Sequence, residues 1–253
     1  MRPLSASNLL EIWERGLGRS PVEQALIILG AVFPQAAWEA LTRLTIAQRD
    51  TALFHLRELT FGAQVKGLAE CPACHERLEL AFSADDLRSM NLLPEPDFSL
   101  PDVPAAVTLF RAKGYEVGFR LPTSADLLNI ARLADEEQAR LRLLEACIVS
   151  ARHRKQVVSI EELPPGLVPD VIEQIGQAAA LANLTISATC PACSHQWEIV
   201  FDIVSYFWSE INAWAMRMMR EIHVLASTYG WNEADILSMS AWRRQRYLEL
   251  IGA

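Results

Sequence analysis

Four cysteines carry the clearest chemistry in the sequence. The stretch Cys71-Pro-Ala-Cys74 recurs further along the chain as Cys190-Pro-Ala-Cys193. A Cys-x-x-Cys turn offers two thiolates to one metal ion, and a structural zinc ion takes four ligands in a tetrahedron. Two such turns that face each other would complete one closed site. We therefore predict that these four cysteines bind one structural zinc ion per chain.

Strand patterns flank both cysteine turns. Residues 184–189 before the second turn alternate between apolar and small polar side chains, and residues 77–82 and 197–202 after the two turns also alternate. The copies match beyond the cysteines as well, and each ends on a phenylalanine, Phe82 or Phe201. We interpret them as a repeat of strand, turn and strand that forms one zinc ribbon split across the chain. A long insertion between the halves is tolerable because loop-closure entropy grows slowly with length.

Three other interpretations of the cysteines remain open at this point. A thioredoxin-like redox pair would place its first cysteine at a helix N-terminus, whereas both turns here lead into strand patterns. Two separate metal sites could each be completed by His75, by His195 or by a second subunit. The thiols could also be free of metal. A closed four-thiolate site has no open position for water, so the predicted zinc would stabilise the fold and would not catalyse a reaction.

Composition and charge exclude several classes of protein. The chain has 253 residues, of which 51% are hydrophobic and 21% charged, as is typical of a globular protein. A formal net charge of −8 disfavours a general affinity for nucleic acid. The uncharged stretch at residues 24–38 is too short to span a bilayer, and the N-terminus lacks a secretory pattern. We expect a cytoplasmic protein with reduced thiols and no membrane span.

Helix signals dominate the segment before the first cysteine turn. Ser20 with Glu23, and Thr45 with Gln48, have the spacing of a capping box. Trp13 lies on a short helix near the N-terminus, where it either folds back on its own core or contacts another protein.

The segment between the two cysteine turns mixes strand and helix signals. Residues 92–106 are rich in proline and indicate a linker, and residues 106–123 indicate a β-hairpin with its turn near Lys113-Gly114. Thr123 is expected to cap a helix, and the helical pattern continues to about Ser150 with a break near residues 134–138. We interpret the basic run 152–155 as a solvated helix end, with an anion or an acidic partner face as the alternative. Residues 167–182 indicate one more helix.

The C-terminal segment is helical and rich in aromatic residues. Apolar residues recur at helical spacing from Phe207 to Leu225, Gly230 ends that helix, and Asn232 and Ser240 are expected to cap two more. Tryptophan is common where proteins bind each other. We therefore assign a partner surface to five tryptophans: Trp13, Trp208, Trp214, Trp231 and Trp242.

Together these patterns predict an α+β protein that is predominantly helical. It contains a small split zinc ribbon of two CPAC hairpins, an inserted β-hairpin-plus-helix module and a C-terminal helical region. The expected division is an N-terminal helical region (1–62), the first zinc-ribbon hairpin (63–90), the inserted hairpin and helices (91–183), the second zinc-ribbon hairpin (184–202) and the C-terminal helical region (203–253).

No catalytic motif stands out in the sequence. It has no Gly-rich phosphate loop, no G-x-S-x-G and no H-E-x-x-H, and its five histidines are scattered. We expect a non-enzymatic protein without catalytic residues or a small-molecule substrate. Two other classes stay open. A zinc-ribbon adaptor that binds nucleic acid or the transcription machinery would need a clustered basic face, and a metal or thiol enzyme would need an open metal position or a reactive cysteine.

Three stretches resemble a known family. They are LLEIWERGLGRSPVEQAL at 9–26, YEVGFRLPTSADLLNIA at 115–131 and EIHVLASTYGWNEADILSMSAWRRQRYLELI at 221–251. They are similar to the baseplate and baseplate-hub assembly proteins of contractile phage tails and phage-tail-like contractile injection systems. The resemblance implies a non-enzymatic part in the baseplate, with other baseplate subunits as partners. It also implies incorporation into a virion or a phage-tail-like particle assembled in the cytoplasm, or the role of an assembly chaperone that leaves.

Overall fold

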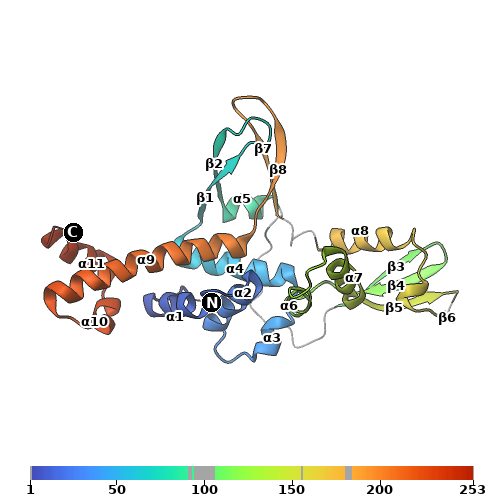
Figure 1. Ribbon diagram of the computed structural model, residues 1–253, viewed down its shortest axis with the longest axis horizontal. Coiled ribbons are helices and arrows are strands. Elements are labelled where there is room, and N and C mark those ends of the chain that lie inside the picture. The colour runs from blue at the N-terminus through green and yellow to red at the C-terminus, as the bar shows by residue number, and fades with distance from the viewer. Residues whose placement is uncertain (1, 91–92, 94–105, 155, 180–183, 253) are drawn as a thin grey trace.

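The structure, a computed structural model, describes residues 2–90, 93, 106–154, 156–179 and 184–252. The predicted proline-rich linker lies almost entirely outside the described residues. Figure 1 shows an elongated molecule in which helices form a central body and the two cysteine hairpins project from it side by side. The inserted sheet lies at one end of the molecule and the C-terminal helices lie at the other.

Four helices build the N-terminal part of the body. They are α1 (Ala6–Gly16), α2 (Pro21–Val32), α3 (Trp38–Thr42) and α4 (Ile46–Phe61). The side chains of Ser20 and Thr45 accept hydrogen bonds from the N–H groups of Glu23 and Gln48, whose own side chains accept from the two capping residues in return. Both predicted capping boxes are confirmed.

Two antiparallel hairpins carry the cysteine turns. The first consists of β1 (Gln64–Glu70) and β2 (Arg77–Ser83), and the second of β7 (Thr185–Thr189) and β8 (Gln196–Val200). Pairing runs up to the turn in both hairpins, where Glu70 opposes Arg77 and Thr189 opposes Gln196. The predicted order of strand, cysteine turn and strand is confirmed for both copies. A short helix, α5 (Ala84–Ser89), follows the first hairpin.

The insertion folds around one four-stranded antiparallel sheet in the order β3-β4-β5-β6. Its elements are β3 (Thr108–Ala112), β4 (Tyr115–Phe119), α6 (Ser124–Ile130), α7 (Glu136–Cys147), β5 (Ile148–His153), β6 (Gln156–Val157), the 3-10 turn η1 (Ile160–Glu162) and α8 (Val168–Ala178). Lys113 and Gly114 form the predicted hairpin turn, with φ values of 54° and 81°. Positive φ at both positions is the signature of the tight turn that suits a two-residue hairpin.

The prediction of helix to about Ser150 is wrong in its last turn. Helix α7 ends at Cys147 and the chain continues as β5, in which Ala151 pairs with Val117 of β4 and His153 pairs with Tyr115. The β-branched residues Ile148 and Val149 fit a strand well, and pairing with β4 overrides the helical pattern of the preceding residues. Residues 152–154 of the basic run therefore belong to a strand and its turn, and the interpretation of the run as a helix end is wrong for these residues.

Three helices form the C-terminal part, as the sequence predicts. They are α9 (Ile203–Tyr229), α10 (Glu233–Ser238) and α11 (Ala241–Leu250). Gly230 ends α9 with a φ of 70°, and Asn232 and Ser240 cap the next two helices with their side chains. In the part of the chain that the structure describes, no helix combines the length and apolar character needed to cross a bilayer.

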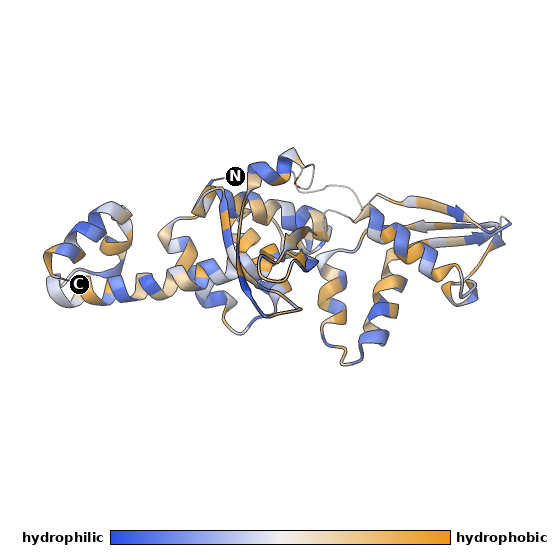
Figure 2. Ribbon diagram, turned by 90° about the horizontal axis from the view of Figure 1, so that it is seen from above, coloured by the Kyte–Doolittle hydropathy of each residue, from blue (hydrophilic) through white to orange (hydrophobic). Residues whose placement is uncertain are grey.

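The described residues bury three hydrophobic clusters, and the helices that contribute to them carry many hydrophobic residues (Figure 2). The first joins α1, α2 and α4 to the start of α9, the second joins the rest of α9 to α10 and α11, and the third lies between the inserted sheet and helices α7 and α8. The predicted α+β class is confirmed. Helix α9 thus ties the two ends of the chain into one body, and that body supports both cysteine hairpins.

Candidate metal centre

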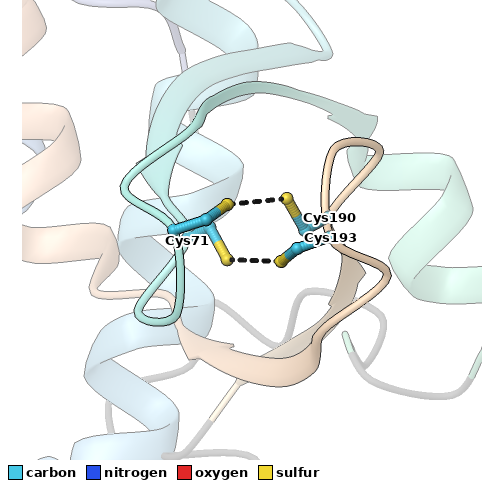
Figure 3. Close-up of side chains that lie close together, drawn as sticks. Cys71, Cys190 and Cys193 are labelled. Atoms are coloured by element: carbon cyan, nitrogen blue, oxygen red, sulfur yellow. Dashed lines mark hydrogen bonds between the residues drawn. The ribbon is translucent and has the colours of Figure 1, made fainter.

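The sulfur atoms of Cys71, Cys74, Cys190 and Cys193 form one cluster at the turns of the two hairpins. All four lie within 4.8 Å of one another. Two pairs cross between the hairpins, with 3.7 Å from Cys71 to Cys193 and 3.5 Å from Cys74 to Cys190 (Figure 3). A tetrahedral zinc site with Zn–S bonds of about 2.3 Å separates its sulfur atoms by about 3.8 Å. The cluster therefore has the size and donor set for one such ion.

The two cysteine turns adopt the same backbone conformation. In each, the N–H of the first cysteine donates to the carbonyl oxygen five residues later, that of Glu76 or His195, at 2.9 Å. The residue after the second cysteine is left-handed in both turns, with a φ of 61° at His75 and 59° at Ser194. The sequence repeat is thus also a repeat in three dimensions, and each copy presents its two thiols in the same way.

The two turns bury their cysteines in the same pattern. The first cysteine of each turn, Cys71 or Cys190, is buried, and the second, Cys74 or Cys193, is exposed. Two sulfur donors lie beneath the turns and two lie at the surface. An ion at the centre would be held from both hairpins.

The thiols influence one another's pKa values. Burial raises the pKa of Cys190, but backbone N–H groups of Cys193 and Ala192 that point at its sulfur outweigh burial and bring the value down to about 7. The N–H of Glu76 favours the thiolate of Cys74, yet the neighbouring sulfur atoms of Cys193 and Cys190 raise that pKa to about 12. Four thiolates cannot share so small a space without a cation, because like charges disfavour ionisation. This is the electrostatic setting in which a divalent ion is bound by thiolates.

The histidines next to the turns do not join the cluster. The Nδ1 atom of His75 lies 2.6 Å from Oε1 of Glu70, and the ring of His195 stacks on Trp197 at a centroid distance of 6.0 Å. Both turns also lead into strands and not into helices. The geometry favours a single four-sulfur site over two sites completed by histidine and over a thioredoxin-like pair.

Aromatic residues hold the two hairpins together at their base. Phe82 and Phe201 contact each other edge to face with ring centroids 5.2 Å apart, and Phe201 also packs on Phe54 of α4. The hydroxyl of Tyr206 on α9 donates to the carbonyl oxygen of Lys66 and accepts from its N–H, which ties β1 to the body. The contact between the two phenylalanines was not predicted from the sequence, although their equal positions in the two copies of the repeat are the signal that could have indicated it.

Two of the five tryptophans assigned to a partner surface join α1 to α9. The indole N–H of half-buried Trp13 donates to Oδ1 of Asn212 at 2.8 Å. The ring of Trp208 covers Gly16 so closely that a Cβ at that glycine would lie 2.3 Å from it. Trp214 is half-buried between the first two clusters.

The other two tryptophans lie near the C-terminus. Trp231 stacks on Tyr229 with centroids 4.4 Å apart. Trp242 is 70% exposed, and the guanidinium of Arg246 lies 5.3 Å from its ring centroid. The partner contact of all five stays a prediction, and exposure favours Trp242.

The fold and the cysteine cluster define a mixed α+β protein with a candidate structural metal centre. The model of the family described as T4 bacteriophage base plate protein matches residues 26–208. This range begins within α2 and ends within α9, so it encloses both cysteine hairpins and the whole insertion. The chain belongs to this baseplate family, and the predicted resemblance is confirmed. No curated protein and no solved structure matches the chain.

Proposed function

We propose that the protein is a structural component, or an assembly factor, of the baseplate of a contractile phage-tail-like particle, where it binds other baseplate subunits. The family match across residues 26–208 carries this proposal. Baseplate proteins are structural, which supports a non-enzymatic role. The protein would act within the virion or particle, or in the cytoplasm where the particle is built.

The proposal includes one structural zinc ion per chain, bound by Cys71, Cys74, Cys190 and Cys193. Two observations support it, the four sulfur atoms within 4.8 Å and the equal geometry of the two turns. Binding of a structural zinc ion can contribute on the order of 10 kcal/mol to folding. Here that free energy would hold the two ends of the insertion together at the hairpins, beside the body.

The expected five-part division is kept as part of the proposal. The N-terminal region (1–62) and the start of the C-terminal region (203–253) share the first hydrophobic cluster, so they act as one support. The hairpins (63–90 and 184–202) would then position the insertion (91–183) on that support. The exposed Trp242, at the end opposite the sheet, would provide a contact point for a partner.

Particle purification tests the proposal. Tail particles from the producing host are separated into baseplate and tube fractions, and the chain is measured by mass spectrometry in each fraction and in assembly intermediates. We expect the wild-type chain in baseplates or in their precursors. A Cys71→Ala variant should be depleted there, whereas Cys147→Ala, which changes a cysteine outside the cluster, should be retained. Absence of the wild-type chain from baseplates and precursors would contradict the proposal.

A zinc-ribbon adaptor for nucleic acid is the alternative function. One observation favours it, a cluster of basic residues on the inserted sheet. Retention of the chain on duplex DNA that weakens steeply with salt would support this alternative.

A further inference from the structure

The register of the inserted sheet places two arginines on either side of one carboxylate. Arg111 on β3 lies opposite Glu116 on β4, which lies opposite Arg152 on β5. Directly opposed residues in antiparallel strands point to the same face, so the three side chains form one row. The Nε–H of Arg111 donates to Oε2 of Glu116 at 2.6 Å. Within the described residues, Arg152 has no side-chain hydrogen bond or ion pair.

Two more cations lie at the hairpin turns beside this row. Lys113 and Arg154 have left-handed backbones with φ values of 54° and 48°, and the N–H of Arg154 donates to the carbonyl oxygen of Gly114. This bond holds the two turns side by side. A left-handed backbone costs an L-residue about 1–2 kcal/mol, and cationic residues occupy both positions nonetheless. Lys113 contacts Asp170, whereas Arg154 has no side-chain partner among the described residues.

The cations surround a hollow. Its volume is about 460 Å³, and its lining includes Arg111, Lys113, Tyr115, Arg152 and Arg154. The ring of Tyr115 stacks on His153 with centroids 4.3 Å apart on the opposite face of the sheet, the face that carries Val117. Among the described residues that line the hollow, Glu116 is the one carboxylate. A site with this balance of charge attracts anions, in a chain whose formal net charge is −8.

No described element covers this face of the sheet. Val117 and Ala151 point to the other face, where they pack in one cluster with Leu167 and Val171 next to α8. Leu109 is two residues before Arg111 on β3, so it lies on the same open face, and its side chain is 54% exposed. The inserted sheet lies at the end of the molecule opposite the C-terminal helices (Figure 1), and the outer tips of its strands are coloured hydrophilic (Figure 2).

We propose that this cationic face binds a carboxylate-rich segment of a neighbouring baseplate subunit. Guanidinium groups match carboxylates with two parallel hydrogen bonds, and Arg152 and Arg154 are the donors available for them. A long polyanion such as DNA would extend beyond this small patch onto an acidic chain, which would repel it. The partner's identity as a baseplate subunit rests on the proposed function, whereas the carboxylate site rests on the sheet alone.

Peptide binding to the full chain tests this inference. The chain is immobilised through its C-terminus, away from the sheet, and probed with an eight-residue peptide of alternating Glu and Val and with the matched Gln and Val peptide. We expect the Glu peptide to bind, to weaken at least about tenfold as salt rises from about 50 to about 300 mM, and to bind better than the Gln peptide. The double variant R152E/R154E should weaken binding at least about tenfold. The control R217E/R220E on exposed α9 positions makes the same change of charge and should alter binding less than about twofold.

Three results would overturn the inference. The first is equal affinity of the wild-type chain for the Glu and Gln peptides, or equal affinity of wild type and R152E/R154E for the Glu peptide. The second is full displacement of the peptide by inorganic phosphate, which would indicate a site for free anions. The third is tighter binding of a short DNA duplex, lost in the same variant, which would indicate a nucleic-acid surface. A failure of the proposed function can be told apart from these results. The wild-type chain would then be absent from baseplates and their precursors, while the full chain would still bind the Glu peptide.

Discussion

Phe82 and Phe201, which occupy the same position in the two copies of the repeat, pack against each other edge to face with ring centroids 5.2 Å apart. The cysteines of the same copies meet at the opposite end of the hairpins. The two hairpins are therefore joined twice, by rings at the base and by sulfur atoms at the turns. A metal ion at the turns would close a unit that is already held at its base.

The phenylalanine contact should be measurable as a coupling between the hairpins. Phe82→Ala and Phe201→Ala should each lower the free energy of unfolding by about 3 kcal/mol, because each removes a packed ring. The double variant should lose about 1 kcal/mol less than the sum, since edge-to-face pairs contribute about that much beyond their burial. Urea unfolding at a fixed zinc concentration gives these values. Strict additivity would show that the two rings act independently.

Loss of any one cysteine ligand should remove the whole contribution of the metal. Cys71→Ala and Cys190→Ala should therefore lower the melting temperature by equal amounts, and a chelator should lower that of wild type but not that of either variant. Cys147→Ala, in the core of the insertion, should leave the chelator effect intact. Thermal unfolding with and without chelator tests this expectation. Unequal losses for Cys71 and Cys190 would point to two independent sites.

Much of the candidate site could be predicted because it depends on local sequence. Two cysteines three positions apart, placed between two strand patterns, indicate a turn that offers two metal ligands. The pairs Cys71 with Cys74 and Cys190 with Cys193 both have this spacing. The capping boxes at Ser20 and Thr45 are local in the same way. Ser83 with Asp86 has the same spacing and would have indicated α5, which the sequence analysis assigned to the hairpin segment.

The ion pair between Arg57 on α4 and Glu210 on α9 should contribute strongly to the body. Its two bonds measure 2.8 and 2.6 Å, and the Arg57 side chain is 3% exposed. Arg57→Ala would leave Glu210 unpaired and should cost about 3 kcal/mol of unfolding free energy. Arg142→Ala, which breaks the exposed pair with Glu145, should cost less than about 1 kcal/mol. Chemical denaturation of both variants compares them, and equal costs would contradict the structural role given to Arg57.

Asp126 should make stability depend on pH. Burial opposes its ionisation, but the Arg120 guanidinium and the N–H of Thr123 outweigh burial and hold the pKa of this carboxyl below its usual 3.8. A carboxyl whose pKa is lowered by folding stabilises the protein above its unfolded pKa, and the contribution is lost as pH falls through the folded value. The stability difference between wild type and Asp126→Asn should thus be constant above about pH 5 and shrink below about pH 4.

Denaturation of both proteins from neutral pH to about pH 3 measures that difference. The cysteine cluster is present in both proteins, so its own pH dependence does not change the difference between them. A difference that grows as the pH falls would contradict the assigned role of the Arg120–Asp126 pair.

The features that the sequence did not reveal depend on contacts between distant segments. Ile148 to His153 follow a helix without a break in pattern, and they become a strand because β4 offers them an edge. The row of Arg111, Glu116 and Arg152 exists only once that pairing sets the register. Likewise, the sequence alone indicates Trp13 and Trp208 as residues that contact a partner protein. In the structure both make contacts between α1 and α9 of the same chain.

The most direct test of the account is the zinc content of single chains, measured by native mass spectrometry and elemental analysis on wild type, Cys71→Ala and Cys190→Ala. A single site built from both repeats should give one zinc ion per wild-type chain and none in either variant. Two ions per wild-type chain, or an ion retained after loss of either cysteine, would contradict it.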